Sequence, residues 1–319
     1  MIDHKTFREI VECEDPVETI WKILSDIWSK GAESLLQGKS TVKEYYAQCE
    51  ATSDMTERVL LKAFFDFYGY LLDLTGKRKL LRNRFPSDVN TALIMDSMSL
   101  REAAVIVKEL EKRGFDIQEF TYDASASPSE TEAYRFKNLG VKTFQELLHK
   151  KKLGFKPLSV MKEADIDELE PSDESMLIWS AFPDILLQGS SLNYESIHSK
   201  TEEVLFKTLD VLKPHKVIIA SDHGYVADVG TWGMPSEHVK VFQKVFKTHR
   251  FKKLSEIDSE TLNWIMGLPR DSSYFIHDNE RIYVRGRYMW TTKGRRPVSF
   301  HGGISVLEVL CPFIVAQRG

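Results

Sequence analysis

The sequence has little cysteine, no strong excess of charge and no long apolar run. Its three cysteines, Cys13, Cys49 and Cys311, lie far apart and form no CxxC pair, so neither a disulfide framework nor a thiolate zinc site is expected. The formal net charge of −4 disfavours a protein that coats nucleic acid. No apolar run reaches the ~20 residues that span a bilayer, and residues 1–5 lack the pattern of a secretory signal. We therefore expect a cytoplasmic protein without membrane contact.

The first part of the chain is predicted to be helical. With 319 residues, of which 42% are hydrophobic, the chain is long enough for one large domain and a smaller attachment. Asp15, followed by Pro16, and Thr41 each precede apolar residues at helical spacing and provide helix-start signals. The apolar run over residues 59–74 predicts one buried core helix that stops at Gly76.

A basic segment separates this helical part from the rest. Residues 77–86 (KRKLLRNRFP) are rich in lysine and arginine and end in a proline. We interpret the segment as a solvated linker, with a phosphate or nucleic-acid contact as the alternative. The sequence therefore predicts a helical N-terminal domain over residues 1–88 and a second domain over residues 89–319.

From residue 91 onward, short apolar runs alternate with amphipathic helices. Such alternation is typical of an α/β domain whose central sheet is largely parallel and flanked by helices. One of these helices begins with a capping box formed by Ser99 and Glu102. The runs expected to be strands cover residues 91–95, 115–122, 176–179 and 217–220.

Acidic residues follow three of these predicted strands. Asp96, Asp184 and the pair Asp222-His223 each come just after an apolar run. A single aspartate in such a place is usually a turn or cap residue. Because ligands bind beyond the carboxyl ends of parallel strands, however, these side chains are expected to lie close together. Carboxylates and an imidazole suit zinc or manganese, and the cation would offset the repulsion between the carboxylates.

A histidine-containing turn near the end of the chain is the next signal. His301 is followed by Gly302 and Gly303, which allow close approach of the backbone, and Ser305 and Glu308 predict another capping box. The simple alternative is a tight turn with an incidental histidine.

Residues 127–132 (SPSETE) offer several hydroxyls at a predicted helix start. Any of them is a possible helix cap. A hydroxyl activated by a metal is a possible nucleophile.

Together these motifs resemble the PglZ-domain branch of the alkaline phosphatase superfamily. The resemblance covers residues ~91 to 319 and implies an alkaline-phosphatase-like sandwich fold. It also implies a metal-dependent phosphohydrolase, a phosphodiesterase or phosphatase, that forms a covalent phospho-threonine intermediate. By this resemblance, one zinc ion would be surrounded by Asp96, Thr131, Asp222 and His223, with Thr131 as the nucleophile. Asp184 and His301 would hold a second metal, and Mn²⁺ is an alternative to Zn²⁺.

The sequence departs from the family pattern at one ligand position. The superfamily usually has a histidine four residues after the aspartate that corresponds to Asp184, whereas this chain has Gln188. Gln188 is a candidate ligand for the second metal, but glutamine is a weak, neutral oxygen ligand. The second site is therefore expected to be looser, to use His198, or to stay empty. Arg135, one turn after Thr131, is a candidate for binding the substrate phosphate, or is an ordinary exposed arginine.

A basic and aromatic run precedes His301. Its pattern suits nucleotide or oligonucleotide recognition, but also an ordinary half-buried strand, which we favour. The residues concerned are Arg281, Tyr283, Arg285, Arg287, Tyr288, Trp290, Lys293, Arg295 and Arg296.

A different class of function is a catalytically weak or inactive scaffolding module. Domains of the same branch resemble parts of prokaryotic regulatory and anti-phage systems, and Gln188 fits a degenerate site. The helical N-terminal part would then be the surface that docks a protein partner. A sulfatase is disfavoured. Sulfatases need a Cys or Ser two residues before a Pro and an Arg two residues after it, whereas Pro128 has Ala126 and Glu130 at these positions.

Overall fold

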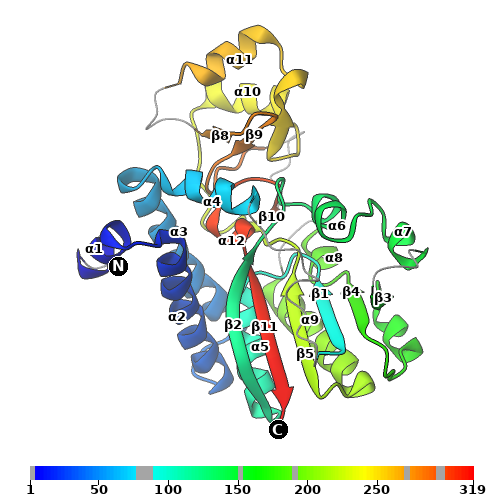
Figure 1. Cartoon of the computed structure of the whole chain (residues 1–319). Helices are drawn as coiled ribbons and strands as arrows, with labels where there is room; N and C mark the ends of the chain where they lie inside the picture. The colour runs from blue at the N-terminus through cyan, green and yellow to red at the C-terminus, as the bar shows by residue number, and fades with distance from the viewer. Residues whose placement is uncertain (1–3, 77–88, 150–153, 189–192, 269–273, 292–298) are drawn as a thin grey trace.

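A six-stranded mixed sheet forms the centre of the chain (Figure 1). The computed structural model describes residues 4–76, 89–149, 154–188, 193–268, 274–291 and 299–319. The strands of this sheet are β1 (Thr91–Met95), β2 (Phe115–Ala124), β3 (Lys156–Val160), β4 (Met176–Ser180), β5 (Lys216–Ser221) and β11 (Leu310–Arg318). Their order is β2-β11-β5-β1-β4-β3.

The sheet is mostly parallel, as the sequence predicts. Strands β5, β1, β4 and β3 run parallel to one another, while β11 runs antiparallel to both β2 and β5. The predicted α/β architecture with a largely parallel sheet flanked by helices is therefore confirmed. The finer assignment to an alkaline-phosphatase-like sandwich stays a prediction.

Helices cover both faces of the sheet, which explains why its strands are apolar without interruption. Alternate residues of β1 face two different hydrophobic clusters, with Leu93 in one and Ile94 in the other. The first face is covered by α5 (Leu100–Lys112), η2 (Glu163–Glu168) and α9 (Tyr194–Leu212). The second is covered by α6 (Thr131–Leu139) and α7 (Phe144–His149).

Four helices precede the sheet: α1 (His4–Glu12), α2 (Pro16–Leu36), α3 (Val42–Ala63) and α4 (Phe67–Gly76). The predicted caps are confirmed, because Asp15 accepts a hydrogen bond at the start of α2 and Thr41 forms a capping box at the start of α3. The expected single helix over 59–74 is wrong. The helix is interrupted because Phe65 leaves it to stack beneath the Arg285 guanidinium, 3.7 Å from the ring centroid.

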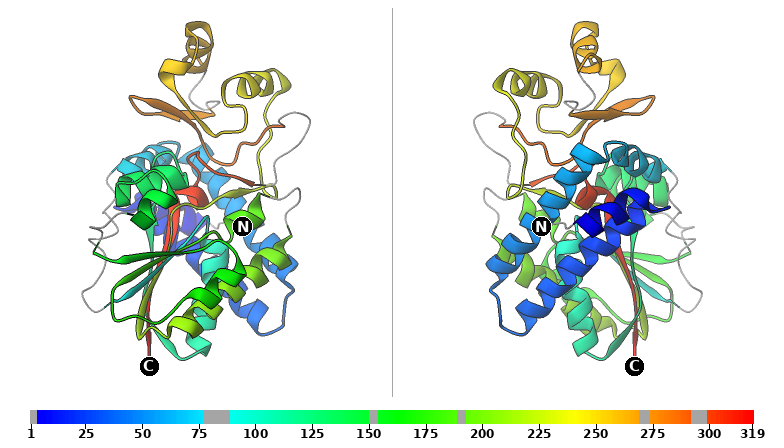
Figure 2. Two further views of the ribbon diagram at one scale, coloured as in Figure 1. Left: turned by 90° about the vertical axis from the view of Figure 1, so that its right-hand side faces the viewer. Right: turned by 90° about the vertical axis from the view of Figure 1, so that its left-hand side faces the viewer.

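The N-terminal helices pack directly on the α/β part. One hydrophobic cluster contains Trp28 of α2, Leu100 of α5 and Leu307 of the short helix α12 (Val306–Val309). The views in Figure 2 show α2 lying alongside α5. Residues 77–86, where the domain boundary is expected, lie outside the described residues, so the boundary at residues 88–89 stays a prediction. Within the described ranges, no helix combines the length and apolar character that a membrane crossing requires.

A smaller subdomain, which we call the cap, projects beyond the carboxyl ends of the parallel strands (Figures 1 and 2). Its own hydrophobic core includes Phe242, Phe246 and Phe275. Strands β6 (Val226–Ala227) and β10 (Ser299–Phe300) form a separate two-stranded sheet at the base of the cap. The short helix α8 (Asp184–Leu187) comes after β4 along the chain. The cap consists of α10 (Ser236–Val245), β7 (Phe251–Lys253), η3 (Leu254–Glu256), α11 (Ser259–Met266), β8 (Phe275–His277) and β9 (Arg281–Val284).

Buried ion pairs join the three parts of the chain. Glu50 of α3 pairs with Arg101 of α5 at 2.8 Å and also with Arg287, which follows β9. Arg287 in turn donates to Glu57 of α3 at 2.7 Å. Burial alone would raise the pKa of Glu50, but Arg101 and Arg287 outweigh it and lower that pKa. Burial raises the pKa of Glu57, and its ion pair with Arg287 opposes this change only in part. All four side chains are at most 2% exposed.

Removing one arginine from this network is predicted to destabilise the whole fold. Arg287→Met leaves Glu57 without a cation and should lower the free energy of unfolding by about 3–5 kcal/mol. Urea unfolding followed by circular dichroism measures the change. Arg8→Met, which removes an exposed pair with Glu12, is the control and should change nothing measurable. Equal effects of the two substitutions would contradict the assigned role of the network.

Candidate metal centre

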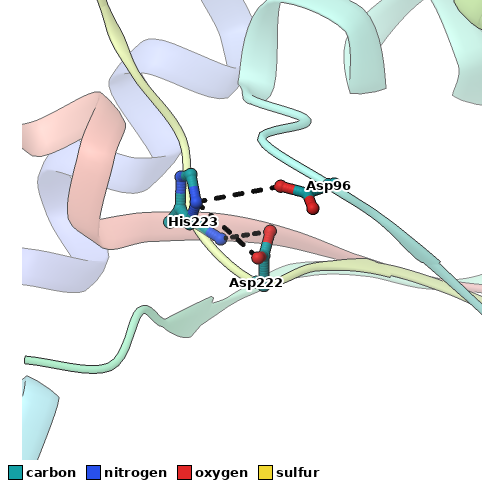
Figure 3. Close-up of side chains that lie close together, drawn as sticks. All are labelled: Asp96, Asp222 and His223. Atoms are coloured by element: carbon teal, nitrogen blue, oxygen red, sulfur yellow. Dashed lines mark hydrogen bonds and ion pairs between the residues drawn. The ribbon is translucent and has the colours of Figure 1, made fainter. Parts of the chain in front are cut away.

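Asp96 and Asp222 lie side by side because their strands end in register. Met95 of β1 is paired with Ser221 of β5, and each aspartate is the next residue of its strand. Figure 3 shows the two carboxylates with His223 beside them. The sequence-based expectation that the carboxyl edge gathers these residues is therefore confirmed for this group.

These three side chains have the spacing of metal ligands. One oxygen of Asp96, one of Asp222 and one ring nitrogen of His223 all lie within 4.8 Å of one another. His223 Nε2 is 3.8 Å from Asp96 Oδ1 and 3.6 Å from Asp222 Oδ2. Among the residues that the structure describes, this is the group of three that fits a metal ion.

The imidazole of His223 is oriented for coordination. Its Nδ1 lies 3.0 Å from the carbonyl oxygen of Gly224. A carbonyl only accepts hydrogen bonds, so Nδ1 carries the proton and Nε2 presents its lone pair to the two carboxylates. A backbone carbonyl that fixes the tautomer in this way is the usual partner of a metal-binding histidine.

One oxygen of Asp222 is buried with no hydrogen-bond donor. Asp222 Oδ1 accepts from the backbone N–H groups of Ser97 at 3.0 Å and of His223 at 2.9 Å. Within the described part of the chain, no hydrogen bond reaches Oδ2, although Asp222 is fully buried. An anionic oxygen in this state is costly unless a cation binds it. The residues present therefore fit a divalent ion.

The pKa values of the two aspartates also reflect a deficit of positive charge. Burial raises the pKa of Asp96 to about 8, with a further contribution from the neighbouring Asp222 carboxylate. Burial likewise raises the pKa of Asp222 to about 6, although the backbone hydrogen bond from Ser97 opposes the change. Two carboxylates so close together cannot both be ionised at low cost without a cation.

The hydroxyl of Thr131 lies next to this group, at the first position of α6. Thr131 Oγ1 is 3.0 Å from Asp96 Oδ1 and 3.1 Å from His223 Nε2. Both partners are acceptors, while the hydroxyl has one proton. The preceding residue, Glu130, gives no side-chain cap to the helix, so the first-turn N–H groups keep the partial positive charge of a helix N-terminus. The prediction that a serine or threonine hydroxyl in this turn caps the helix is wrong.

Arg135 is held near the site through an aromatic contact. Its guanidinium lies over the ring of Trp179, 5.6 Å from the centroid. The indole N–H of Trp179 donates to Asp96 Oδ2 at 3.2 Å. Arg135 Nε is buried and, in the described part of the chain, has no hydrogen-bond partner. Arg135 is therefore a half-buried side chain beside the site and not an ordinary exposed arginine.

His301 joins the site by stacking on His223. The two ring centroids are 4.5 Å apart and the rings are inclined by 23°. His301 Nδ1 lies 3.2 Å from the carbonyl oxygen of Ser129. Burial lowers the pKa of His301, and the neighbouring His223 lowers it further. His301 thus lies against His223, the candidate metal ligand, with a pKa lowered by its surroundings.

The capping box expected from Ser305 and Glu308 is wrong. Ser305 makes no side-chain cap bond at the start of α12. Glu308 instead accepts from the backbone N–H of Gly303 at 3.1 Å and from Arg250 Nε of the cap at 3.0 Å. The Glu308 carboxylate pairs with the buried Arg250 and therefore does not cap α12. Its hydrogen bond from the Gly303 N–H fixes the turn that carries His301.

Asp184 and Gln188 lie close together, but they are hydrogen-bonded to each other. Gln188 Nε2 donates to Asp184 Oδ2 at 2.5 Å, and Ser97 Oγ donates to Asp184 Oδ1 at 2.9 Å. His198, considered as a substitute ligand, lies within α9 and pairs with Glu202 at 3.3 Å. Of the ligands implied for a second metal, His301 stacks on the first group and Asp184 is hydrogen-bonded on both oxygens.

The described part of the basic and aromatic run forms strand β9 and the segment after it. Arg287 is buried in the ion network, and Arg285 is buried over Phe65. Tyr283 and Trp290 are buried as well. The half-buried-strand interpretation is therefore confirmed for β9, and the remaining basic residues, Lys293, Arg295 and Arg296, lie outside the described residues.

Sequence reasoning missed four residues that border the site. Ser97 links Asp222 to Asp184, and Trp179 links Asp96 to Arg135. Glu130, next to Thr131, pairs with the cap residue His249 at 3.8 Å. Ser97 and Glu130 were detectable as polar neighbours of Asp96 and Thr131. Trp179 and His249 give no local signal, because they reach the site only through the fold.

A scan against protein-family models finds no matching model, and a search of curated proteins finds no matching protein. The arrangement of the site residues is therefore what bears on the function of the chain.

Metal affinity is predicted to fall as the solution becomes more acidic. Binding requires ionised Asp96 and Asp222, whose pKa values in the folded state are about 8 and about 6. Below pH 8 each unit should cost about tenfold in Mn²⁺ affinity, and more below pH 6, because protons must be displaced. The stability of the metal-free fold has the opposite dependence on pH. The fold loses stability as pH rises from about 4 to about 8, since the folded state retains protons that the unfolded state releases.

Isothermal titration with Mn²⁺ at pH 6 and at pH 8 measures this dependence. Asp222→Asn should lose high-affinity binding at both pH values, whereas the matched surface substitution Asp116→Asn should bind as the unmodified protein does. The same affinity at pH 6 and pH 8 would show that the two aspartates are not the ligands.

Proposed function

We propose that this chain is a metal-dependent phosphohydrolase that acts on phosphodiesters, with Thr131 as its nucleophile. The observation that carries the proposal is the position of the Thr131 hydroxyl, 3.0 Å from Asp96 and 3.1 Å from His223, beside the donor-free oxygen of Asp222. A hydroxyl next to a group of metal ligands is the arrangement that activates an otherwise weak nucleophile. The proposal agrees with the resemblance to the PglZ branch.

The proposed reaction has two displacements at phosphorus. Asp96, Asp222 and His223 would hold Zn²⁺ or Mn²⁺, and the ion would lower the pKa of the Thr131 hydroxyl and offset the phosphoryl charge. Thr131 Oγ1 would give its proton to solvent and attack phosphorus as the bond to the leaving oxygen breaks, and that oxygen would take a proton from solvent to leave as an alcohol. Water would then attack the same phosphorus as the bond to Thr131 breaks; one of its protons passes to Thr131 Oγ1, and the product is a phosphate monoester.

Two further features support a phosphoryl substrate. The N–H groups at the start of α6 are not capped by the Glu130 side chain, and a helix N-terminus favours anionic oxygens. Arg135 is held over Trp179 with its Nε buried and without a hydrogen-bond partner in the described part of the chain. The planar guanidinium group in general suits bidentate binding of phosphoryl oxygens.

Removal of the hydroxyl is predicted to abolish turnover. Thr131→Ala should reduce hydrolysis of bis(4-nitrophenyl) phosphate in the presence of Mn²⁺ or Zn²⁺ by at least about a hundredfold, because no nucleophile remains. Thr131→Ser keeps a hydroxyl and should retain part of the activity. Thr52→Ala, on α3 away from the site, should leave the rate unchanged.

Undiminished turnover in Thr131→Ala would rule out Thr131 as the nucleophile. If the unmodified protein neither takes up a divalent ion nor hydrolyses the diester, the alternative function, a scaffolding or binding module, is favoured. Metal analysis of the purified protein distinguishes the two.

A further inference from the structure

Asp184, the aspartate expected to bind a second metal, is instead hydrogen-bonded on both oxygens. Asp184 is at the start of α8, and its two oxygens accept hydrogen bonds from Ser97 Oγ and Gln188 Nε2. Gln188 is four residues further along, which places its side chain on the same helical face. The amide nitrogen of Gln188, a donor, thus occupies the place where a metal-binding histidine would present a lone pair.

The remaining groups are too few for a second cation site. A catalytic zinc ion usually has three protein ligands from histidine, aspartate, glutamate or cysteine. Of the described residues that the resemblance implies for a second site, Asp184 and His301 remain when Gln188 is set aside, which is one short of three. Among the residues that the structure describes, the Asp96, Asp222 and His223 group is the one that reaches three.

The hydrogen bonds of Asp184 lead instead to the first site. Ser97 donates from its hydroxyl to Asp184 and from its backbone N–H to Asp222 Oδ1 at 3.0 Å. It does so with a left-handed backbone, φ 64°, which is unfavourable for a residue with a side chain. Asp184 therefore stabilises the conformation in which Ser97 holds one oxygen of Asp222 and leaves the other free for metal.

We infer that this chain binds a single divalent cation, that Gln188 closes the second site, and that Asp184 is a positioning residue for Asp222 and not a ligand. The inference rests on the proposed metal centre, but it does not depend on the reaction that the centre catalyses. Outer hydrogen-bond partners of this kind typically change metal affinity by about ten- to a hundredfold when they are removed.

Metal stoichiometry tests the closed second site. Titration of metal-free protein with Zn²⁺, followed by calorimetry and metal analysis, should give one equivalent bound with high affinity. Gln188→His supplies the missing imidazole and should raise the value to two equivalents. The matched control Gln48→His adds an exposed imidazole on α3 and should leave it at one. Two equivalents in the unmodified protein, or one in Gln188→His, would overturn the inference.

Metal affinity tests the positioning role of Asp184. Asp184→Ala removes the acceptor for Ser97 Oγ and should weaken Zn²⁺ binding at the single site by about ten- to a hundredfold. Asp184→Asn keeps an acceptor oxygen and should restore the affinity to nearly that of the unmodified protein. A general loss of folding is distinguished by thermal unfolding of the metal-free forms, which should be similar. If Asp184→Asn binds as weakly as Asp184→Ala, Asp184 acts through its charge and the positioning role is wrong.

The two proposals fail in different ways. One equivalent of metal without hydrolysis of any phosphoester would refute the proposed function and leave the single-cation inference standing. Hydrolysis of the phosphodiester with two equivalents of metal bound would refute the single-cation inference and leave the proposed function standing. No metal uptake at all would refute both.

Discussion

Two carboxylates, Asp96 and Asp222, are held against each other in buried surroundings because β1 and β5 end in register. The sheet leaves them no freedom to separate, and burial makes their ionisation costly, as their raised pKa values reflect. Hydrogen bonds stabilise the two carboxylates in part: Trp179 donates to Asp96, and Ser97 donates to Asp222. The donor-free oxygen of Asp222 is what these groups leave unsatisfied.

The ion network around Glu50 shows that the same fold can neutralise a buried carboxylate when its stability requires this. Glu50 is as inaccessible as Asp222, yet its pKa is lowered, because Arg101 and Arg287 are within hydrogen-bond distance. No lysine or arginine forms an ion pair with Asp96 or Asp222 among the described residues. The contrast with Glu50 agrees with the proposed metal site at the strand ends, because a cation there would supply the positive charge that Arg101 and Arg287 supply to Glu50.

The sequence predicts features that depend on neighbours along the chain and misses those that depend on the fold. The caps at Asp15, Thr41 and Ser99 are local hydrogen bonds, and the positions of Asp96 and Asp222 follow from strand ends in a parallel sheet. The break in the helix at Phe65 and the pairing of Glu308 with Arg250 were not predictable, because each is decided by a residue tens to hundreds of positions away. Local propensity is a weak guide wherever a buried charge needs a distant partner.

The cap and the candidate metal centre are packed together through the turn at Gly303. A Cβ atom at this position would lie 2.6 Å from Arg250 Nε and 2.7 Å from the carbonyl oxygen of Val284, so a glycine is required for the turn to approach the cap. Arg250 and the Gly303 N–H share the carboxylate of Glu308, and the same turn carries His301 onto the ring of His223. The ring of His223 is therefore fixed from one side by the sheet and from the other by a turn whose position depends on the cap.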